Sequence, residues 1–202
     1  MDRIQNTVTN FKFKPINVRN VLNSLEVSVK QKNTFIQAAV FLPVFNVKTS
    51  PYLLLIKRSD KTKLHKGEIA LPGGTKESQD STTLETALSE PQEELGIEPS
   101  SVEILGQLNT VTTKTGFLID SFVGEIRYPC PIIVNHDEVA EIIELPLGVL
   151  ANWNHAMETL DSGEPSFHYG SHYIWGATAR ILREFASVIN PTERRIQILG
   201  KS

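Results

Sequence analysis

The chain has 202 residues, a length that suits one domain with a sizeable hydrophobic core. Its net charge of −3 gives no sign of a nucleic-acid or membrane binder, and its single cysteine, Cys130, excludes an internal disulfide and a cysteine-based zinc site. No apolar run approaches the length of a membrane span, and the N-terminus is too polar for a signal peptide. We therefore expect a globular, cytoplasmic protein with no nucleic-acid or membrane partner.

The first part of the chain predicts an arm, a helix and two strands. Apolar residues at helical spacing favour a short helix from about Asn17 to Ser28, within an N-terminal arm of residues 1–33. Phe35 to Val47 is rich in β-forming residues, and Pro43 inside it predicts a strand that bends or lies at a sheet edge. Tyr52 to Lys57 predicts a second strand, of buried character.

The middle of the chain predicts a short strand, a glycine turn and a helix. The short strand is expected at Glu68 to Leu71. The sequence Pro72-Gly73-Gly74 predicts a turn that brings bare backbone close to whatever binds there. Thr82 and Glu85 have the spacing of a capping box, so a helix is expected to begin there. Gly96 stands where the left-handed residue at the end of that helix belongs.

The second half of the chain predicts further strands and one long helix. The expected elements are paired strands at 102–112 and 117–127, a strand at 141–145, a short helix at 147–152, a hairpin at 166–175 and an amphipathic helix at 177–189. Mixed strands with two well-separated helices indicate an α+β fold.

Three glutamates gather on the predicted helix that follows the glycine pair. Glu90 precedes Glu93 and Glu94 by three and four residues, so the three carboxylates share one helical face without an intervening Lys or Arg. One interpretation is a solvated helix face. The other is a site for a hard divalent cation, since Mg²⁺ binds through a few carboxylates together with substrate phosphates. The second interpretation predicts a metal-dependent site that acts on a phosphate compound.

This stretch resembles the Nudix box, a pattern of Gly, five residues, Glu, seven residues and then Arg-Glu-apolar-X-Glu-Glu-X-Gly-apolar. Gly74 opens the pattern, Asp80 stands for the first acid, and the closing residues are Glu90, Glu93, Glu94, Gly96 and Ile97. Eight residues rather than seven separate Asp80 from Ser89. This expansion is similar to the coenzyme A pyrophosphatase branch of the Nudix hydrolases, as are the upstream run from Leu54 to Gly74 and the stretch from Tyr173 to Leu182.

The resemblance implies a single Nudix hydrolase domain over residues 1–202, an α/β/α sandwich with the box helix against a mixed sheet. The expected catalytic core covers residues 34–190, and residues 191–202 form a tail. The implied cofactor is Mg²⁺ or Mn²⁺, with Glu90 and Glu94 as main ligands, Glu93 assisting and the Gly73 carbonyl adding a ligand. The implied general base is either a box glutamate, Glu90 or Glu93, or an acid from a later loop. Glu138 and Glu141 match the later acids, although a polar loop edge explains each of them equally well.

Candidate substrate contacts surround the glycine pair. Arg58 is preferred for phosphate because its planar guanidinium matches phosphate geometry. The other candidates are Lys63, His65, Gly67 and Gly74. Alternatively, the basic residues form an exposed loop, and His65 holds that loop through a hydrogen bond. Phe117 and Trp175 could stack on an adenine or a pantetheine arm, although core packing is the preferred interpretation of Trp175.

Two residues depart from the box. Ser89 replaces its arginine, and Pro91 lies inside the helix, where proline costs about 3 kcal/mol. The expected function is metal-dependent hydrolysis of coenzyme A or its thioesters to 3′,5′-ADP and (acyl-)4′-phosphopantetheine. One alternative is hydrolysis of another nucleoside diphosphate derivative, such as ADP-ribose, NADH or an oxidised nucleotide. Another is a Nudix ligand-binding module that has lost turnover. The partner is a small-molecule substrate, and the oligomeric state stays open, with a homodimer among the alternatives.

Overall fold

The computed structural model describes residues 35–127, 129–152 and 163–190, the backbone of residues 157–159, and the separate residues Arg19, Leu22 and Asn23. The predicted arm and helix before residue 34 lie almost entirely outside these ranges, and the predicted tail after residue 190 lies wholly outside them. None of the helices in the described ranges has the length and hydrophobicity needed to cross a membrane.

Short strands and three α-helices make up the described chain. The elements are β1 (Ile36–Val47), β2 (Ser50–Arg58), β3 (Ile69–Ala70), β4 (Gly73–Thr75), α2 (Thr83–Leu95), the 3₁₀ turn η1 (Pro99–Ser101), β5 (Val102–Gln107), β6 (Val111–Thr112), β7 (Phe117–Ile126), β8 (Val139–Pro146), α3 (Leu147–Ala151), β9 (Met157–Thr159), β10 (Pro165–Tyr169), β11 (His172–Ile174) and α4 (Gly176–Ile189). The strands and helices predicted within the described ranges are confirmed with bounds shifted by a few residues, except that the strand expected at 102–112 is interrupted between Gln107 and Val111. The turn predicted at the glycine pair is a strand instead.

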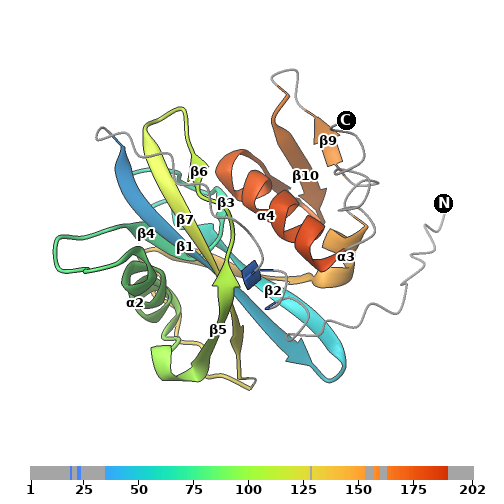
Figure 1. Ribbon diagram of the computed structural model, residues 1–202, viewed down its shortest axis with the longest axis horizontal. Coiled ribbons are helices and arrows are strands. Elements are labelled where there is room, and N and C mark those ends of the chain that lie inside the picture. The colour runs from blue at the N-terminus through green and yellow to red at the C-terminus, as the bar shows by residue number, and fades with distance from the viewer. Residues whose placement is uncertain are drawn as a thin grey trace.

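One mixed sheet forms the centre of the molecule. Its main strand order is β3-β2-β1-β7-β5, and β1 and β7 form its parallel pair. The remaining strands of this sheet attach at the sides, β4 to β1, β6 to β7 and β8 to β2. A second, small sheet contains β11, β10 and β9. Figure 1 shows α2 on one side of the large sheet and α4 on the other.

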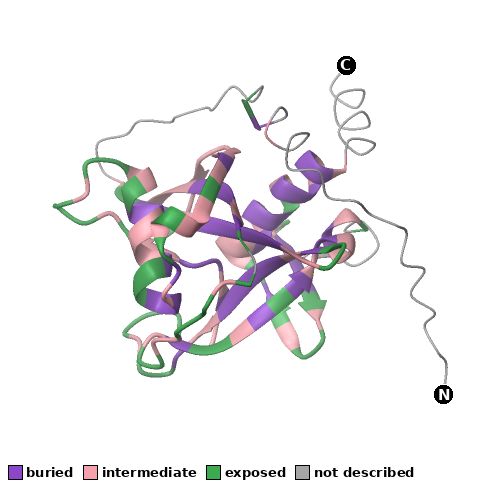
Figure 2. Ribbon diagram, turned by 90° about the horizontal axis from the view of Figure 1, so that it is seen from below, coloured by how far each residue is buried: buried purple, intermediate pink, exposed green. Residues whose placement is uncertain are grey.

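Alternating side chains of the central strands fill two hydrophobic cores. On β1, Leu42 and Val44 belong to the core under α3 and α4, whereas Phe41 and Phe45 belong to the core under α2. This period of two is what a strand buried on both faces requires. Buried segments run through the middle of the molecule between the helices (Figure 2). The α+β fold and the α/β/α sandwich with a mixed sheet are therefore confirmed.

Of the two alternatives for the strand that contains Pro43, a bend or a place at the sheet edge, the edge is wrong. Strand β1 is central, and Pro43 lies opposite Gly124 of β7. On its other side, β1 pairs antiparallel with two different strands, with β4 up to Val40 and with β2 from Val44 onward. Because Phe41 donates its N–H toward this side, to Pro72 O, the ring nitrogen of Pro43 faces the same gap between the two partners. The missing proline donor therefore falls where the ladder is already interrupted.

The glycine pair is a short strand rather than a turn. Gly73 and Gly74 belong to β4 and lie opposite Val40 and Ala39 of β1. A side chain at Gly73 would overlap the carbonyl oxygen of Ala39, and its φ of 152° disfavours other residues. The bare backbone that the sequence predicted is present, and its neighbours are the sheet and, on Gly74, the helix α2.

Truncating the buried face of α4 should destabilise the fold strongly. Phe185 is fully buried, so Phe185→Ala is expected to lower the free energy of unfolding by about 3–5 kcal/mol, measured by chemical denaturation. Arg183, on the exposed face of the same helix, provides the control. Arg183→Ala should stay within about 0.5 kcal/mol of the parent protein, and equal losses in both variants would contradict the sandwich packing.

Candidate active site

Helix α2 has well-formed ends. The Thr82 hydroxyl accepts the N–H of Glu85 at 3.2 Å, and the Glu85 carboxylate accepts the N–H of Thr82 at 3.3 Å. At the other end Gly96 adopts a φ of 68° and donates its N–H to the carbonyl of Gln92. The predicted capping box and left-handed terminal glycine are both confirmed. The helix runs unbroken through the buried Pro91.

Threonine hydroxyls anchor α2 to its surroundings. Thr86 Oγ1 donates to the Asp80 carboxylate at 2.8 Å, and Thr83 Oγ1 donates to Asp120 of β7 at 2.8 Å. Ser89, at the position of the box arginine, donates only to the carbonyl of Thr86 within its own helix. The first acid of the box is thus attached to α2 by a threonine, without an arginine.

Glu90 and Glu94 lie one helical turn apart and face the glycine strand β4. The Glu94 side chain is buried, and its Oε2 accepts the N–H of Gly73 at 3.2 Å. A Cβ added to Gly74 would overlap the Glu90 carboxylate. A side chain at this position would therefore force the Glu90 carboxylate to move.

Burial and mutual repulsion hold protons on these two glutamates. Burial, aided by the charge of Glu90, raises the pKa of Glu94 to about 8, against a smaller opposing effect of Arg58. Burial, aided by the charges of Glu93 and Glu138, raises the pKa of Glu90 to about 7. Arg58 Nη1 lies 3.8 Å from Glu94 Oε1, so one guanidinium faces several carboxylates. The cluster has an excess of negative charge that a cation would offset.

The two carboxylates fit a divalent cation of the hard class. Among the described residues, no three Asp, Glu, His or Cys side chains converge closely enough to form a complete protein ligand set. Mg²⁺ is usually held by one or two carboxylates, with substrate phosphates and water filling its other positions. Glu90 and Glu94 are the residues that would hold it, beside the bare backbone of Gly73.

A cavity of about 680 Å³ lies beside these glutamates. The predicted site residues that line it are Glu90, Glu94, Glu138, Arg58, His65, Gly73 and Gly74. Four others do not line it, namely Glu93, Lys63, Gly67 and Glu141. Glu93 and Lys63 have exposed side chains, although the charge of Glu93 still reaches Glu90.

The segment that carries Glu138 is bound to the end of α2. Asn135 donates its backbone N–H to the carbonyl of Glu94 at 2.9 Å, and Ile133 donates to that of Leu95 at 2.8 Å. Glu138 follows directly and its charge acts on both Glu90 and Glu94. Of the two acids from the later segment, Glu138 is therefore the one whose charge acts on the glutamates of α2.

Glu141 and His65 have local partners of their own. Glu141 lies on β8, where its Oε1 is 3.3 Å from His172 Nε2, outside the cavity. His65 adopts a φ of 59°, and its Nδ1 lies 3.1 Å from Glu68 Oε2. That contact matches the structural interpretation of His65, which nevertheless borders the cavity.

Several lining residues were not predicted as site residues from the sequence. They include Leu64, Lys114, Glu164 and Arg180, and the two residues considered for stacking, Phe117 and Trp175, also line the cavity. The preferred core packing of Trp175 is wrong, because 45% of this residue is exposed at the cavity. Its position directly before the glycine that begins α4 holds the ring outside the core.

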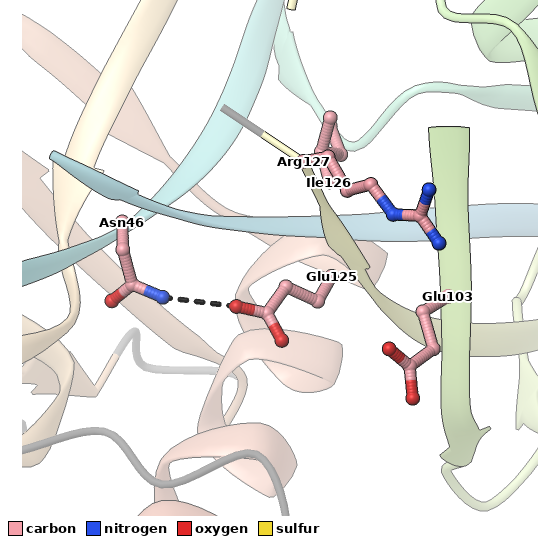
Figure 3. Close-up of a pocket in the computed structure, with 5 residues that line it drawn as sticks. All are labelled: Asn46, Glu103, Glu125, Ile126 and Arg127. Atoms are coloured by element: carbon pink, nitrogen blue, oxygen red, sulfur yellow. Dashed lines mark hydrogen bonds between the residues drawn. The ribbon is translucent and has the colours of Figure 1, made fainter. Parts of the chain in front are cut away.

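A second, smaller depression lies at the opposite ends of β1 and β7. Its volume is about 380 Å³ and its lining residues are Asn46, Glu103, Glu125, Ile126 and Arg127 (Figure 3). Asn46 Nδ2 donates to Glu125 Oε1 at 3.0 Å, and Glu103 pairs with Arg19. Both acids of this depression therefore have a polar or basic partner.

Comparison with known proteins identifies the family to which the chain belongs. The NUDIX domain model matches residues 35–156, which cover the central sheet and α2. The chain belongs to the Nudix hydrolase family. It is 37% identical over 156 residues to the uncharacterised Nudix hydrolase NudL of Citrobacter koseri, covering 74% of this chain and 81% of that protein. It is 35% identical over 162 residues to NudL of Shigella flexneri, covering 77% and 84%.

Solved structures show the same Nudix fold. The Nudix hydrolase RenU of M. smegmatis superposes with a TM-score of 0.50 at 16% identity, covering 81% of this chain and 86% of RenU. DR0079 of Deinococcus radiodurans superposes with a TM-score of 0.51 at 17% identity, covering 79% and 88%. Membership in the family, shown by the domain match and the NudL relatives, makes the chain a Nudix pyrophosphohydrolase of nucleoside diphosphate derivatives, and such enzymes generally use divalent metal ions such as Mg²⁺ or Mn²⁺.

Removing the Glu94 charge should stabilise the metal-free protein at alkaline pH. The carboxyl titrates near 4.5 when unfolded and near 8 when folded, so the folded state holds the extra proton between these values. The free energy of unfolding therefore falls as the pH rises from about 4.5 to about 8. Glu94→Gln should lessen this fall by about 2 kcal/mol or more, measured by denaturation at both ends of the range with a chelator present.

The exposed Glu98, just beyond α2, gives the matched control, and Glu98→Gln should leave the pH dependence unchanged. Adding Mg²⁺ at alkaline pH should stabilise the parent protein more than the Glu94→Gln variant. An equally steep pH dependence in Glu94→Gln and the parent would count against a buried, charge-strained Glu94.

A methyl group at Gly74 should displace Glu90 and impair turnover. The added Cβ is the sole source of the clash, because the φ of Gly74 lies outside the left-handed region that favours glycine. Because small displacements of reacting groups are costly, Gly74→Ala is expected to lower kcat by about 100-fold. Gly148→Ala, where an added Cβ meets nothing within 4 Å, should retain full activity in the same hydrolysis assay. Unchanged kcat in Gly74→Ala would disprove the tight helix–strand approach.

Proposed function

We propose that this Nudix hydrolase cleaves the pyrophosphate bond of coenzyme A or its thioesters, releasing 3′,5′-ADP and (acyl-)4′-phosphopantetheine. One observation carries the proposal. The two stretches that resemble the coenzyme A pyrophosphatase branch, around Arg58 to Glu68 and around Trp175 to Ile181, are far apart in sequence yet line the same cavity as Glu90 and Glu94. Sequence that resembles this branch therefore lies around the acidic cluster, which supports the proposal.

The cavity also has the size and chemical character that this substrate needs. Its volume of about 680 Å³ falls in the ordinary range for small-molecule sites. Its lining includes both the carboxylates of Glu90, Glu94 and Glu138 and apolar residues such as Leu64, Ile69 and Leu71. A molecule with a charged pyrophosphate and a long, less polar arm therefore finds both kinds of partner in one cavity.

The chain's own groups can carry the chemistry of pyrophosphate cleavage. A bound Mg²⁺ or Mn²⁺ ion supplies charge neutralisation at the phosphate oxygens and makes nearby water more acidic. Arg58 binds and neutralises phosphate oxygens, and the bare Gly74 backbone allows them to approach Glu90. A water oxygen forms a bond to one phosphorus, the bond from that phosphorus to the bridging oxygen breaks, and the second phosphate leaves with the electron pair. A carboxylate accepts the proton of the water.

Glu90 and Glu138 are the preferred candidates for that carboxylate. Both line the cavity, and the pKa of Glu90, at about 7, suits a group that accepts and returns a proton near neutral pH. Glu141, directed at His172, is less suited. The charge of Glu93 helps to raise the pKa of Glu90.

The continuity of α2 argues against the alternative, a Nudix module that binds its ligand without hydrolysing it. The helix stays continuous through Pro91, and the Thr86 hydroxyl holds Asp80 despite the serine at position 89. Hydrolysis of another nucleoside diphosphate derivative, such as ADP-ribose, NADH or an oxidised nucleotide, is the alternative that a substrate panel must separate.

Product analysis tests the proposal. The purified protein is incubated with coenzyme A and Mg²⁺ or Mn²⁺, and products are separated by chromatography. We expect 3′,5′-ADP in amounts equal to 4′-phosphopantetheine, and a loss of about 100-fold or more in Glu94→Gln. Glu98→Gln serves as the exposed carboxylate control and should match the parent.

Other outcomes assign the site differently. Cleavage of ADP-ribose or NADH with intact coenzyme A would keep the pyrophosphohydrolase and reject the substrate. Binding of coenzyme A by calorimetry, with no cleavage of any pyrophosphate in the panel, would instead support a ligand-binding module.

A further inference from the structure

The wall of the cavity formed by the β6–β7 turn and the start of α4 carries positive charge. Lys114 lies in the turn, Arg180 lies on α4, and both line the cavity. Their nearest acid is Glu164, just before β10. Two cations thus share one carboxylate, in a protein whose overall charge is −3.

These cations keep donors that the protein does not use. Lys114 Nζ lies 3.9 Å from Glu164 Oε1, and Arg180 Nε lies 3.6 Å from Glu164 Oε2, both longer than a hydrogen bond. Arg180 Nη2 donates to the carbonyl of Thr112 at 2.8 Å, which fixes the guanidinium in place. Within the described residues, the buried Arg180 Nε has no hydrogen-bond partner. Because that nitrogen is buried and faces Glu164, an incoming anion would meet the remaining guanidinium donors of Arg180 and the exposed Lys114 Nζ.

An exposed aromatic ring completes this wall. Trp175 directly precedes α4, lines the cavity and is 45% exposed. A large aromatic side chain left in contact with solvent at a cavity provides a flat face on which a nucleobase can stack. At Gly176, the next residue, an added Cβ would meet no atom within 4 Å beyond its own chain neighbours.

We propose that Lys114, Trp175 and Arg180 form a subsite for a nucleoside whose ribose carries its own phosphate, in addition to the pyrophosphate that is cleaved. Trp175 stacks on the base, and the two cations bind the phosphate monoester. This inference rests on the proposed function and extends it, because it assigns the 3′-phosphoadenosine end of the substrate to this wall. The less polar arm then extends toward Leu64.

Binding of two nucleotides that differ by one phosphate tests the subsite without turnover. Dissociation constants for 3′,5′-ADP and 5′-AMP are measured by calorimetry on the full chain, with a chelator present. We expect the protein to bind 3′,5′-ADP about tenfold more tightly, the strength of a charged hydrogen-bond contact. Equal affinities, or no binding of either nucleotide, would overturn the proposal.

Three variants separate the roles of the side chains. Lys114→Ala should weaken 3′,5′-ADP alone and remove most of the difference between the nucleotides, and its side chain is 84% exposed, so the fold should be retained. Trp175→Ala should weaken both nucleotides by a similar factor, because both contain the base. Arg183→Gln removes an exposed cation of α4 outside the cavity and should change neither affinity. An unchanged preference in Lys114→Ala, or a similar effect of Arg183→Gln, would reject specific recognition.

Kinetics distinguish failure of the subsite from failure of the proposed function. With metal present, kcat/KM for coenzyme A should exceed that for 3′-dephospho-coenzyme A by about tenfold, mainly through KM, and Lys114→Ala should reduce the ratio toward one. Cleavage of both compounds at equal efficiency would sink the subsite and leave the proposed function standing. Preferential binding of 3′,5′-ADP without cleavage of coenzyme A would do the reverse.

Discussion

The repulsion between two carboxylates on neighbouring turns of α2 is the constraint on which the site depends. Glu90 and Glu94 lie close together where little water reaches them, and among the described residues Arg58 is the cation that offers a compensating charge. Without a bound cation, the two carboxyl groups would favour binding protons over ionisation. Cation binding is the arrangement that lets both carboxylates stay ionised at neutral pH. The adjacent glycine strand is the part of the sheet that permits this proximity.

The packing of the sandwich offsets the loss of stability caused by burying the charged Glu90 and Glu94 close together. Strand β1 has apolar side chains on both faces, so the cores under α2 and α4 share one rigid layer. Capped ends and threonine contacts to Asp80 and Asp120 fix the position of α2 on that layer. Because several independent contacts hold the helix, loss of the box arginine and gain of Pro91 leave its path unbroken. Redundant anchoring explains how a departure from the family pattern can be accommodated.

Local signals in the sequence predicted local structure well. Thr82 and Gly96 act within one turn of the helix end, and the Glu90–Glu94 spacing needs only helical geometry. Features set by distant segments were not accessible in this way. The central place of Pro43 depends on where two other strands stop along β1, and the exposure of Trp175 depends on how α4 meets the sheet. Cavity residues from separate hairpins and loops likewise come together only in the fold.

The backbone bonds from Ile133 and Asn135 to the end of α2 have a consequence for how the family can diversify. They join Glu138 to the same rigid unit as Glu90 and Glu94, so the acidic groups keep their spacing if that unit shifts as a whole. The turn that carries Lys114 lies outside this unit. Mutation, insertion or deletion there can alter the shape of the cavity while the spacing of the acidic groups is retained. Change in the shape of the cavity is thereby separated, within one small domain, from preservation of the acidic cluster.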